Sequence, residues 1–333
     1  MKVKQAEIIR LDSLCIGFSS GRHVNCILPP LSASSKGGEL IAVIGRNGIG
    51  KSTLLRTITG LQPSLGGEIF INGKSTSGYS RLEMARRIGY ISTEVVRVSN
   101  MRVCDLVALG RFPHTNWLGS TDQSDLIAVE SAIERTRMTA LRNRNITELS
   151  DGERQKAMIA RVLAQNTDIL IMDEPTAFLD IASKFEIISL MLELTRDGKT
   201  IIFSTHDFNI AVSQADKIWL ILDDRLAEGS PEDLMLSGCF EHLFDSSVIK
   251  FNSSDGSFIF RNESRGKLFI EGEGNRRKWT ERALSRAGYV VSDSITNPYI
   301  VVPVLADQPW KLIADRKEFS FSSIYDLIRN LRK

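Results

Sequence analysis

The chain has 333 residues, which is more than one average domain, so we expect one large domain and a smaller second one. Its formal net charge is +2 and it has no long basic tract, which argues against nucleic acid as the main partner. No apolar run approaches the ~18 residues needed to cross a bilayer, and the charged first residues do not form a signal peptide. We therefore expect any association with a membrane to go through a partner.

Four cysteines, Cys15, Cys26, Cys104 and Cys239, are far apart in the sequence. They show neither a CxxC pair nor the spacing of a Cys/His metal site. We expect buried, reduced thiols, as is usual in a cytosolic protein.

The first part of the chain is rich in short apolar segments that predict β-strands. Strands are expected at residues 5–18 and 25–31, before the continuous apolar run Leu40–Ile44, which predicts a buried central strand. Two more are expected at Glu68–Ile71, which ends in an Asn-Gly turn, and at Ile88–Ile91.

The segment Gly45–Thr53, GRNGIGKST, follows the central strand and precedes a helix-like stretch, Leu54–Thr59. Glycine lets successive N–H groups converge on an anion at a helix N-terminus, so this arrangement predicts a phosphate cradle. Lys51 is expected to reach the β- and γ-phosphates, and the Ser52 hydroxyl to ligate Mg²⁺. The alternative is an ordinary glycine-rich turn, but the flanking strand and helix favour a nucleoside triphosphate.

From Met101 to about Arg144 the apolar spacing becomes helical, and strands and helices alternate after it. The predicted elements are helices at 103–109 and 125–138, a helix at 152–164, a strand at 168–172, a helix at 181–194, a strand at 200–204, a helix from Asp207 and a strand at 217–222. This order predicts an α/β core with a parallel sheet, interrupted by a helical insertion at about 101–165.

The pattern changes after Pro231, and residues 251–256 (FNSSDG) are polar and turn-rich, as is typical of a linker. The sequence beyond predicts a small α+β domain at 251–333. Its expected strands are 258–261, 267–270, 289–291, 299–304 and 310–314, and its helices are 278–287 and 322–331. From Lys250 onward, fifteen Lys and Arg face ten Asp and Glu, which we interpret as an ordinary solvated surface.

Three further segments carry polar groups that suit phosphoryl transfer. The buried strand in Ile169–Pro175 (ILIMDEP) ends in Asp173, which suits the anchoring of Mg²⁺, and Glu174, which suits the orientation and deprotonation of a water. Residues 149–156 (LSDGERQK) open a helix, and His206 ends an apolar strand. Each has an ordinary alternative, such as a surface turn for the carboxylates or a packed or capping role for the histidine.

In this order and spacing the segments resemble the ATP-binding cassette (ABC) ATPases, the nucleotide-binding subunits of ABC transporters. The phosphate loop resembles their Walker A motif, ILIMDEP the Walker B strand, LSDGERQK the signature motif and Thr176–Asp180 the D-loop. His206 resembles the switch histidine and Phe18 the aromatic that stacks on adenine, although a core position on a strand is an equal alternative for Phe18. The resemblance covers about residues 1–240.

This resemblance implies an α/β P-loop NTPase of the ABC type, with a mixed sheet and a helical subdomain, in residues 1–250, followed by the small α+β extension. It implies that ATP and Mg²⁺ are bound, with Glu174, His206 and Lys51 as catalytic residues. The implied nucleotide contacts are Phe18, Gly45, Arg46, Asn47, Gly48, Ile49, Gly50, Lys51, Ser52, Thr53, Ser150 and Gly152. The implied Mg²⁺ ligands are Ser52 and Asp173, the latter directly or through water.

Two positions depart from the family pattern. A Gln usually follows the strand that here ends at Ile91, whereas this chain has Thr93 and then Glu94. The Thr93 hydroxyl is too short to reach the metal except through water, and Glu94 ligates it directly if the loop shifts by one residue. The signature is also acidic, but Ser150 and Glu153 form the pattern of a capping box, so we expect a structural role for Glu153.

A finer resemblance concerns residues 107–114 (VALGRFPH), which are similar to the LGRxPH segment of importers for iron-siderophores, haem and vitamin B12. In that family the segment lies where the fold faces the permease. The alternative is a helix end stopped by Gly110 and Pro113. Thr115–Gly119 also resembles iron-type importers of anaerobic gut bacteria.

One phosphate loop and one signature per chain imply a homodimer with two shared ATP sites. The resemblance implies the ATPase subunit of an importer for an iron complex or related chelate, peripheral to the cytoplasmic face of a bacterial inner membrane. Its implied partners are permease subunits and, indirectly, a substrate-binding protein, with no nucleic acid. The alternatives are a soluble ABC ATPase acting on DNA or ribosomes, which usually has tandem cassettes or a long coiled coil, and an exporter ATPase, usually fused to transmembrane helices.

The tail carries one notable cluster, Arg276–Trp279, which reads either as a basic patch with an aromatic or as a solvated helix start. We favour the second interpretation, with Trp279 packed inward. Ligand-dependent regulation and extra dimer contacts are the hypotheses for residues 251–333.

Overall fold

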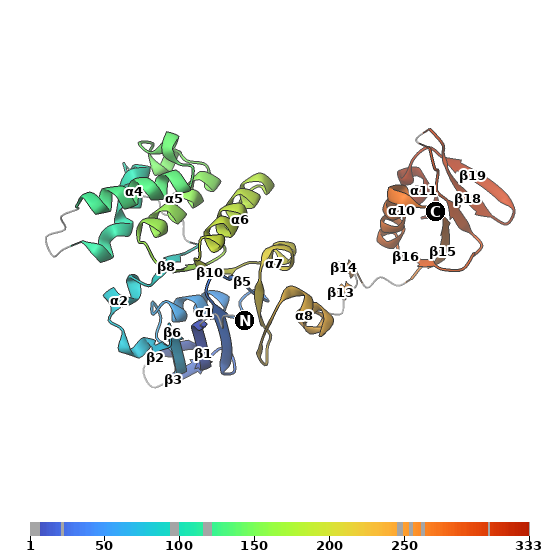
Figure 1. Ribbon diagram of the computed structural model, residues 1–333. Coiled ribbons are helices and arrows are strands. Elements are labelled where there is room, and N and C mark those ends of the chain that lie inside the picture. The colour runs from blue at the N-terminus through green and yellow to red at the C-terminus, as the bar shows by residue number, and fades with distance from the viewer. Residues whose placement is uncertain are drawn as a thin grey trace, which may run out of the picture. The chain divides into compact units, whose positions relative to one another are not determined.

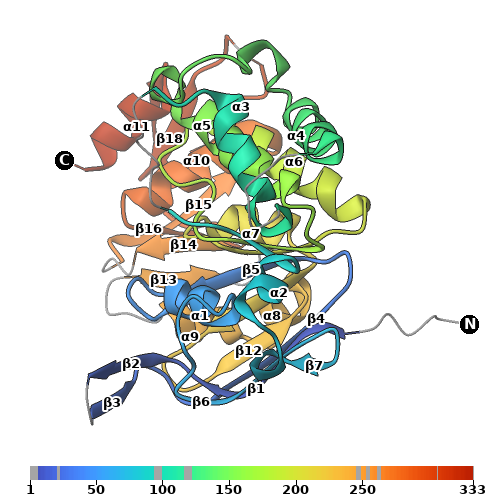
Figure 2. The ribbon, with the colours of Figure 1, turned by 90° about the vertical axis from the view of Figure 1, so that its left-hand side faces the viewer.

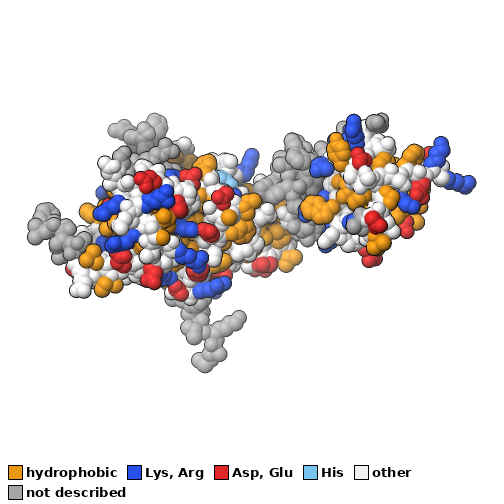
Figure 3. Space-filling model, turned by 90° about the horizontal axis from the view of Figure 1, so that it is seen from above, with side chains coloured by type: hydrophobic (Ala, Val, Ile, Leu, Met, Phe, Trp, Pro, Cys, Tyr) orange, Lys and Arg blue, Asp and Glu red, His pale blue; other side chains and the backbone are white. Residues whose placement is uncertain are grey.

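The computed structural model describes residues 7–20, 23–93, 100–115, 122–244, 249–252, 256–260, 264–305 and 307–332. It divides into two compact units, Met1–Leu243 and Phe244–Lys333 (Figure 1). Among these described residues, no helix is both long enough and apolar enough to cross a membrane. On the face shown in Figure 3, acidic and basic side chains are interspersed.

The centre of the first unit is a six-stranded mixed sheet in the order β12-β11-β5-β10-β9-β8. All its strands run parallel except β12, which is antiparallel to β11. All six residues of β5 are buried, as its continuous apolar run predicts. The strands are β5 (Leu40–Gly45), β8 (Ile88–Ile91), β9 (Ile169–Met172), β10 (Thr200–Ser204), β11 (Lys217–Ile221) and β12 (Leu226–Gly229).

A second, antiparallel sheet has the order β4-β1-β6-β7, and a separate hairpin is formed by β2 and β3. Helix α1 (Lys51–Ile58) packs between the two sheets, because Leu54 and Leu55 share one core with Ile9 of β1 and Val43 of β5 (Figure 2). The strands are β1 (Glu7–Cys15), β2 (Gly17–Ser20), β3 (His23–Cys26), β4 (Leu31–Lys36), β6 (Gly66–Ile71) and β7 (Lys74–Ser75).

The predicted helical insertion lies between β8 and β9 and contains three packed helices. They are α3 (Val103–Ala108), extended by the 3-10 turn η2 (Leu109–His114), α4 (Gln123–Arg135) and α5 (Asp151–Ala164). The other helical elements of this unit are η1 (Thr76–Gly78), α2 (Arg81–Ala85), η3 (Thr139–Leu141), η4 (Ile146–Glu148), α6 (Ile181–Arg196), α7 (Phe208–Gln214), α8 (Pro231–Leu236) and α9 (Cys239–Phe244).

The second unit contains a hairpin and a five-stranded sheet in the order β16-β15-β17-β18-β19. Alternate strand residues such as Leu268 and Ile300 share a core with Leu284 of α10 and Leu327 of α11, so this unit has an α+β core of its own. The elements are β13 (Ile249–Asn252), β14 (Ser257–Phe260), β15 (Gly266–Glu271), α10 (Gly274–Arg286), β16 (Tyr289–Ser292), β17 (Tyr299–Val301), β18 (Trp310–Ala314), β19 (Lys317–Phe321) and α11 (Ile324–Leu331).

Several local predictions are wrong. The expected strand at 25–31 ends at Cys26, and the chain then bends before β4. The linker predicted at 251–256 begins with two residues of β13, and residues 253–255 lie outside the described part of the chain. Trp279 is 60% exposed rather than packed inward, with the Arg282 guanidinium 5.1 Å from the centre of its ring.

The expectation of buried thiols is also wrong. Cys26 is exposed, and Cys15, Cys104 and Cys239 are only partly buried.

Candidate functional site

The loop between β5 and α1 has the backbone of an anion cradle. Gly48 and Gly50 adopt positive φ angles of 79° and 114°, which glycine reaches without steric cost. A Cβ on Gly45 would lie 3.0 Å from the Ile221 carbonyl oxygen, so the loop also needs glycine where it leaves the sheet. Helix α1 begins at Lys51, and its first N–H groups therefore face the loop.

Lys51 lies over this loop and is only 5% exposed. Its ammonium group donates to the carbonyl oxygens of Gly45 at 3.0 Å and Arg46 at 3.3 Å. Burial lowers the pKa of Lys51, while the nearby carboxylates of Glu174 and Asp173 act in the opposite direction. A phosphate placed in the cradle would add further negative charge beside this buried cation.

Asp173 follows β9 and is 1% exposed. Its Oδ1 accepts a hydrogen bond from the Ser52 hydroxyl at 3.0 Å and another from the Ser204 hydroxyl at 2.7 Å. A carboxylate beside a hydroxyl at the edge of a phosphate cradle is an oxygen donor set that suits Mg²⁺. These residues therefore fit the metal that the sequence predicts.

Ser204, the last residue of β10, was not predicted from the sequence. Its hydroxyl also accepts a hydrogen bond from the Glu174 N–H at 2.8 Å, so it holds both consecutive acidic residues. The sequence feature that could have indicated this role is that Ser204 is a small polar residue at the end of an apolar strand, two positions before His206.

Glu174 Oε1 is in direct contact with His206 Nε2. The other ring nitrogen of His206, Nδ1, lies 3.4 Å from the Lys51 ammonium, which favours the tautomer with its proton on Nε2. The structure thus brings together the three residues predicted as catalytic. A carboxylate, an imidazole and a cation beside a phosphate cradle can orient a water, accept its proton and stabilise phosphate charge.

Phe18 is on β2, opposite Asn25, and its side chain is 58% exposed. The alternative of a core aromatic is therefore wrong. An exposed flat ring suits stacking on a base, and the contact with adenine stays a prediction.

The signature segment opens α5 with the predicted capping box. The Ser150 Oγ accepts from the Glu153 N–H at 3.3 Å, and the Glu153 carboxylate accepts from the Ser150 N–H at 2.8 Å. This backbone hydrogen bond lowers the pKa of Glu153. Packing also favours glycine at position 152, because a Cβ there would lie 2.7 Å from the Ser183 Oγ of α6.

Thr93 is exposed after the end of β8, and Glu94 lies outside the described residues. The choice between them as a metal ligand stays a prediction. Residues 116–121, which include most of the predicted Thr115–Gly119 motif, also lie outside the described part.

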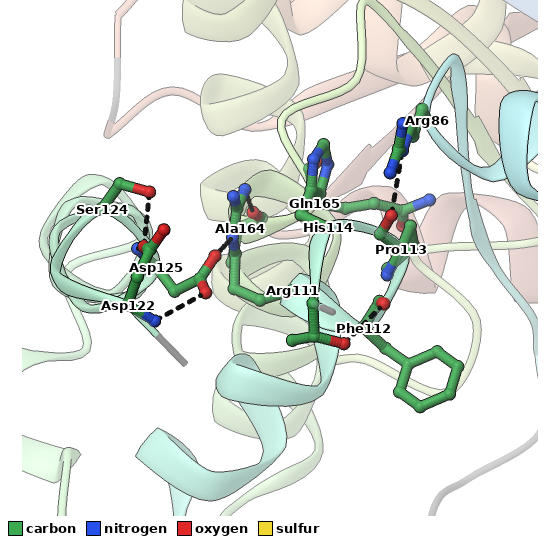
Figure 4. A network of polar contacts seen from close by, with 11 residues as sticks. Arg86, Arg111, Phe112, Pro113, His114, Asp122, Ser124, Asp125, Ala164 and Gln165 are labelled. Carbon is green, nitrogen blue, oxygen red and sulfur yellow. Dashed lines mark hydrogen bonds and ion pairs between the residues drawn. The ribbon is translucent and has the colours of Figure 1, made fainter. Parts of the chain in front are cut away.

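The LGRFPH segment continues α3 as the turn η2 and packs on α5 (Figure 4). A Cβ on Gly110 would lie 2.0 Å from the Arg161 carbonyl oxygen, so only glycine allows this close approach. The Arg111 Nε binds Asp125 Oδ1 at 2.7 Å, and His114 Nε2 lies 2.9 Å from the Gln165 carbonyl oxygen. Phe112 between them is 78% exposed and points away from the network.

Comparison with known proteins identifies the family. The family model described as "ABC transporter" matches residues 28–177, and the model described as "Iron ABC transporter C-terminal domain" matches residues 265–332. The chain is 34% identical over 71% of its length to the ferric enterobactin transport ATP-binding protein FepC of Escherichia coli, of which 86% is covered. It is 35% identical over 67% of its length to the petrobactin import ATP-binding protein FpuC of Bacillus anthracis, of which 83% is covered.

Among solved structures, CbiO1 from Clostridium perfringens, part of the ABC transporter complex CbiONQ, matches with a TM-score of 0.61 and 29% sequence identity. The match covers 69% of this chain and 91% of that protein.

Proposed function

The chain belongs to the family of ATP-binding, ATP-hydrolysing subunits of ABC transporters, and we propose that it powers the import of an iron chelate through a separate permease. The observation that carries the ATPase is the cluster of Lys51, Glu174 and His206 beside the phosphate loop. The iron-import relatives and the match of residues 265–332 to the iron-transporter C-terminal domain support the class of cargo.

In the proposed site, the loop N–H groups and Lys51 hold the β- and γ-phosphates, and Phe18 stacks on the adenine. Ser52 and Asp173 would hold Mg²⁺, which supplies charge neutralisation at the phosphates when bound. Glu174 orients the attacking water and accepts its proton, and its contact with His206 Nε2 fixes the carboxylate in place. His206 then contacts the γ-phosphate.

We further propose that two copies associate with C2 symmetry, so that Ser150 and Gly152 of one subunit complete the ATP site of the other. The Ser150–Glu153 cap is already satisfied within its own helix, so docking onto the γ-phosphate has to compete with this hydrogen bond. ATP stabilises the closed dimer, and hydrolysis of ATP lets the two subunits separate. This cycle of closing and opening drives the permease at the cytoplasmic face of the membrane.

The experiment for the catalytic role is Glu174→Gln, which keeps the shape of the side chain and removes the base. We expect ATP binding to remain and a stable ATP-bound dimer to accumulate in size-exclusion chromatography. Steady-state turnover close to that of the unchanged protein would rule out the role of Glu174.

The transport role is tested by co-purifying the chain with its permease and binding protein and measuring stimulation of ATPase by ferric chelates bound to the binding protein. The Glu174→Gln complex is the matched control. Stimulation by ribosomes or DNA, with none by any loaded binding protein, would favour the soluble ABC ATPase instead.

A further inference from the structure

Two thiols that are separated in the sequence meet at the base of the β2–β3 hairpin. The register pairs Gly17 with Cys26, and Cys15, the last residue of β1, comes two residues before Gly17, so Cys15 and Cys26 are diagonal neighbours. Besides burial, the neighbouring Cys26 thiol raises the pKa of Cys15.

Both cysteines pair with glycines on the neighbouring strands. The residue directly opposite Cys26 is Gly17, and Cys15 pairs with Gly66 on the neighbouring strand β6. A Cβ on Gly66 would lie 3.6 Å from the Cys15 Sγ, which is ordinary van der Waals contact, so Gly66 lies next to this thiol. Cys26 is exposed and Cys15 is partly buried, so a small reagent in solution reaches the pair through Cys26.

The residues next to both thiols touch the nucleotide site. Ile27 donates its N–H to the Ile16 carbonyl oxygen at 3.0 Å and closes the base of the hairpin. A Cβ on Gly50 of the phosphate loop would lie 2.6 Å from the Ile27 Cδ1 and 3.5 Å from the Ile16 Cδ1. Phe18, the predicted adenine contact, is carried by the same hairpin. The thiol pair is thus connected to both ends of the proposed nucleotide site.

We propose that Cys15 and Cys26 are a redox modification site, at which an intramolecular disulfide weakens the binding of ATP. The regulatory part of this proposal rests on the nucleotide site proposed above.

The oxidant is a small-molecule disulfide such as oxidised glutathione. The Cys26 thiolate attacks one of its sulfurs and releases one glutathione thiolate, which leaves a mixed disulfide on Cys26. Cys15 then loses its proton to solvent and attacks the Cys26 sulfur, which releases the second glutathione thiolate. Two cysteine thiols are oxidised to one disulfide, and one glutathione disulfide is reduced to two thiols. Burial raises the pKa of the Cys15 thiol, so this second step accelerates as the pH rises.

Closing the bond has to move the hairpin. Diagonal neighbours in an antiparallel pair have Cα atoms roughly 7 to 8 Å apart, whereas a disulfide requires about 4.4 to 6.8 Å. The two strands therefore approach each other around Gly17, where a Cβ would already lie 2.0 Å from the Asn25 carbonyl oxygen. Because there is no spare room at Gly17, the displacement passes to Phe18 and to the Ile16–Ile27 contact with Gly50.

The test uses the full-length chain, incubated with oxidised glutathione or with dithiothreitol. Intact mass and peptide mapping detect the loss of two hydrogen atoms and the 15–26 crosslink, and calorimetric titration measures ATP affinity. We expect the crosslinked protein to bind ATP about fivefold more weakly, the loss of roughly one aromatic contact, and dithiothreitol to restore affinity. Without the oxidant, Cys15→Ser and Cys26→Ser are expected to bind ATP like the reduced protein. With it, neither forms the crosslink, and Cys15→Ser stops at the glutathione adduct on Cys26.

A Cys104→Ser/Cys239→Ser double variant is the matched control and is expected to respond like the unchanged protein. A stable glutathione adduct on Cys26 without a 15–26 crosslink would overturn the pairing, and a crosslink with unchanged ATP affinity would overturn the regulation. Absence of ATP binding by the reduced protein would instead contradict the proposed nucleotide site, while the crosslink is still measured by mass.

Discussion

Replacing Asp125 by Asn removes the charge opposite Arg111 inside the helical subdomain, and we expect a large loss of stability. The two side chains are 6% and 10% exposed, and the Arg111 Nε lies 2.7 Å from Asp125 Oδ1. Arg111 also donates to the Ala164 carbonyl oxygen at 2.8 Å, so its guanidinium has little room to turn towards water (Figure 4). The substitution therefore leaves a buried cation without its paired carboxylate, and Asp122 remains nearby as a counter-charge.

Removing one partner of a buried ion pair costs about 3 to 5 kcal/mol. The amide keeps one oxygen as an acceptor, so we expect the lower end, about 3 kcal/mol. For a unit of this size each kcal/mol corresponds to about 2 to 4 °C, so the melting temperature should fall by roughly 6 to 12 °C.

Differential scanning calorimetry of the nucleotide-free protein measures this shift in the transition of residues 1–243. Glu148→Gln is the matched control, because its ion pair with Arg144 has both side chains about half exposed and such pairs contribute less than about 1 kcal/mol. The double replacement Arg111→Met/Asp125→Leu removes both charges and should recover most of the loss. The reasoning would be refuted if the melting temperature of Asp125→Asn fell by less than about 2 °C. It would also be refuted if the double variant lost as much stability as the two single variants together.

Four further outcomes are expected. Because burial lowers the pKa of Lys51 below its ordinary 10.5, ATP affinity should already decline as the pH rises towards that value; Lys51→Arg should flatten that decline, since arginine stays charged. Phe18→Ala should weaken ATP binding about fivefold in calorimetry, and Phe18→Tyr should not. The folded-state pKa of Glu153 lies below its ordinary 4.5, so its cap stabilises above that value and is lost as pH falls; acid unfolding of Glu153→Gln should be less steep. Leu284→Ala should cost about 2 to 5 kcal/mol and lower the melting of residues 244–333 while ATPase activity remains.

The parts of the molecule that depend on neighbouring residues in the chain were predictable from the sequence. The strand Leu40–Ile44 is apolar at every position, and only burial on both faces of a sheet satisfies such a run. The capping box at Ser150 and Glu153 needs only three residues of spacing and helical geometry, so its hydrogen bonds follow from the sequence.

The features that the sequence did not predict depend on strand pairing and on which face of a helix packs against the sheet. Cys15 and Cys26 are eleven positions apart, and only the hairpin register places them together. Trp279 was expected in the core because it is large and apolar, but Thr280, Ala283 and Leu284 occupy the buried face of α10. Hydrophobicity alone does not state which face of a mostly polar helix meets the sheet.

Asp173 and Glu174 are consecutive acidic residues, yet the fold gives them different environments. Asp173 continues the line of β9 and is buried, where it accepts hydrogen bonds from two hydroxyls. Glu174 has a φ of 50°, which turns the chain out of the strand and directs its carboxylate to His206. The Ser204 hydroxyl stabilises this turn, because it donates to the carboxylate of Asp173 and accepts from the backbone of Glu174. A single hydroxyl on the neighbouring strand therefore separates the buried carboxylate that we propose as the metal anchor from a carboxylate that stays accessible to water. Backbone conformation rather than residue type distinguishes the two proposed roles.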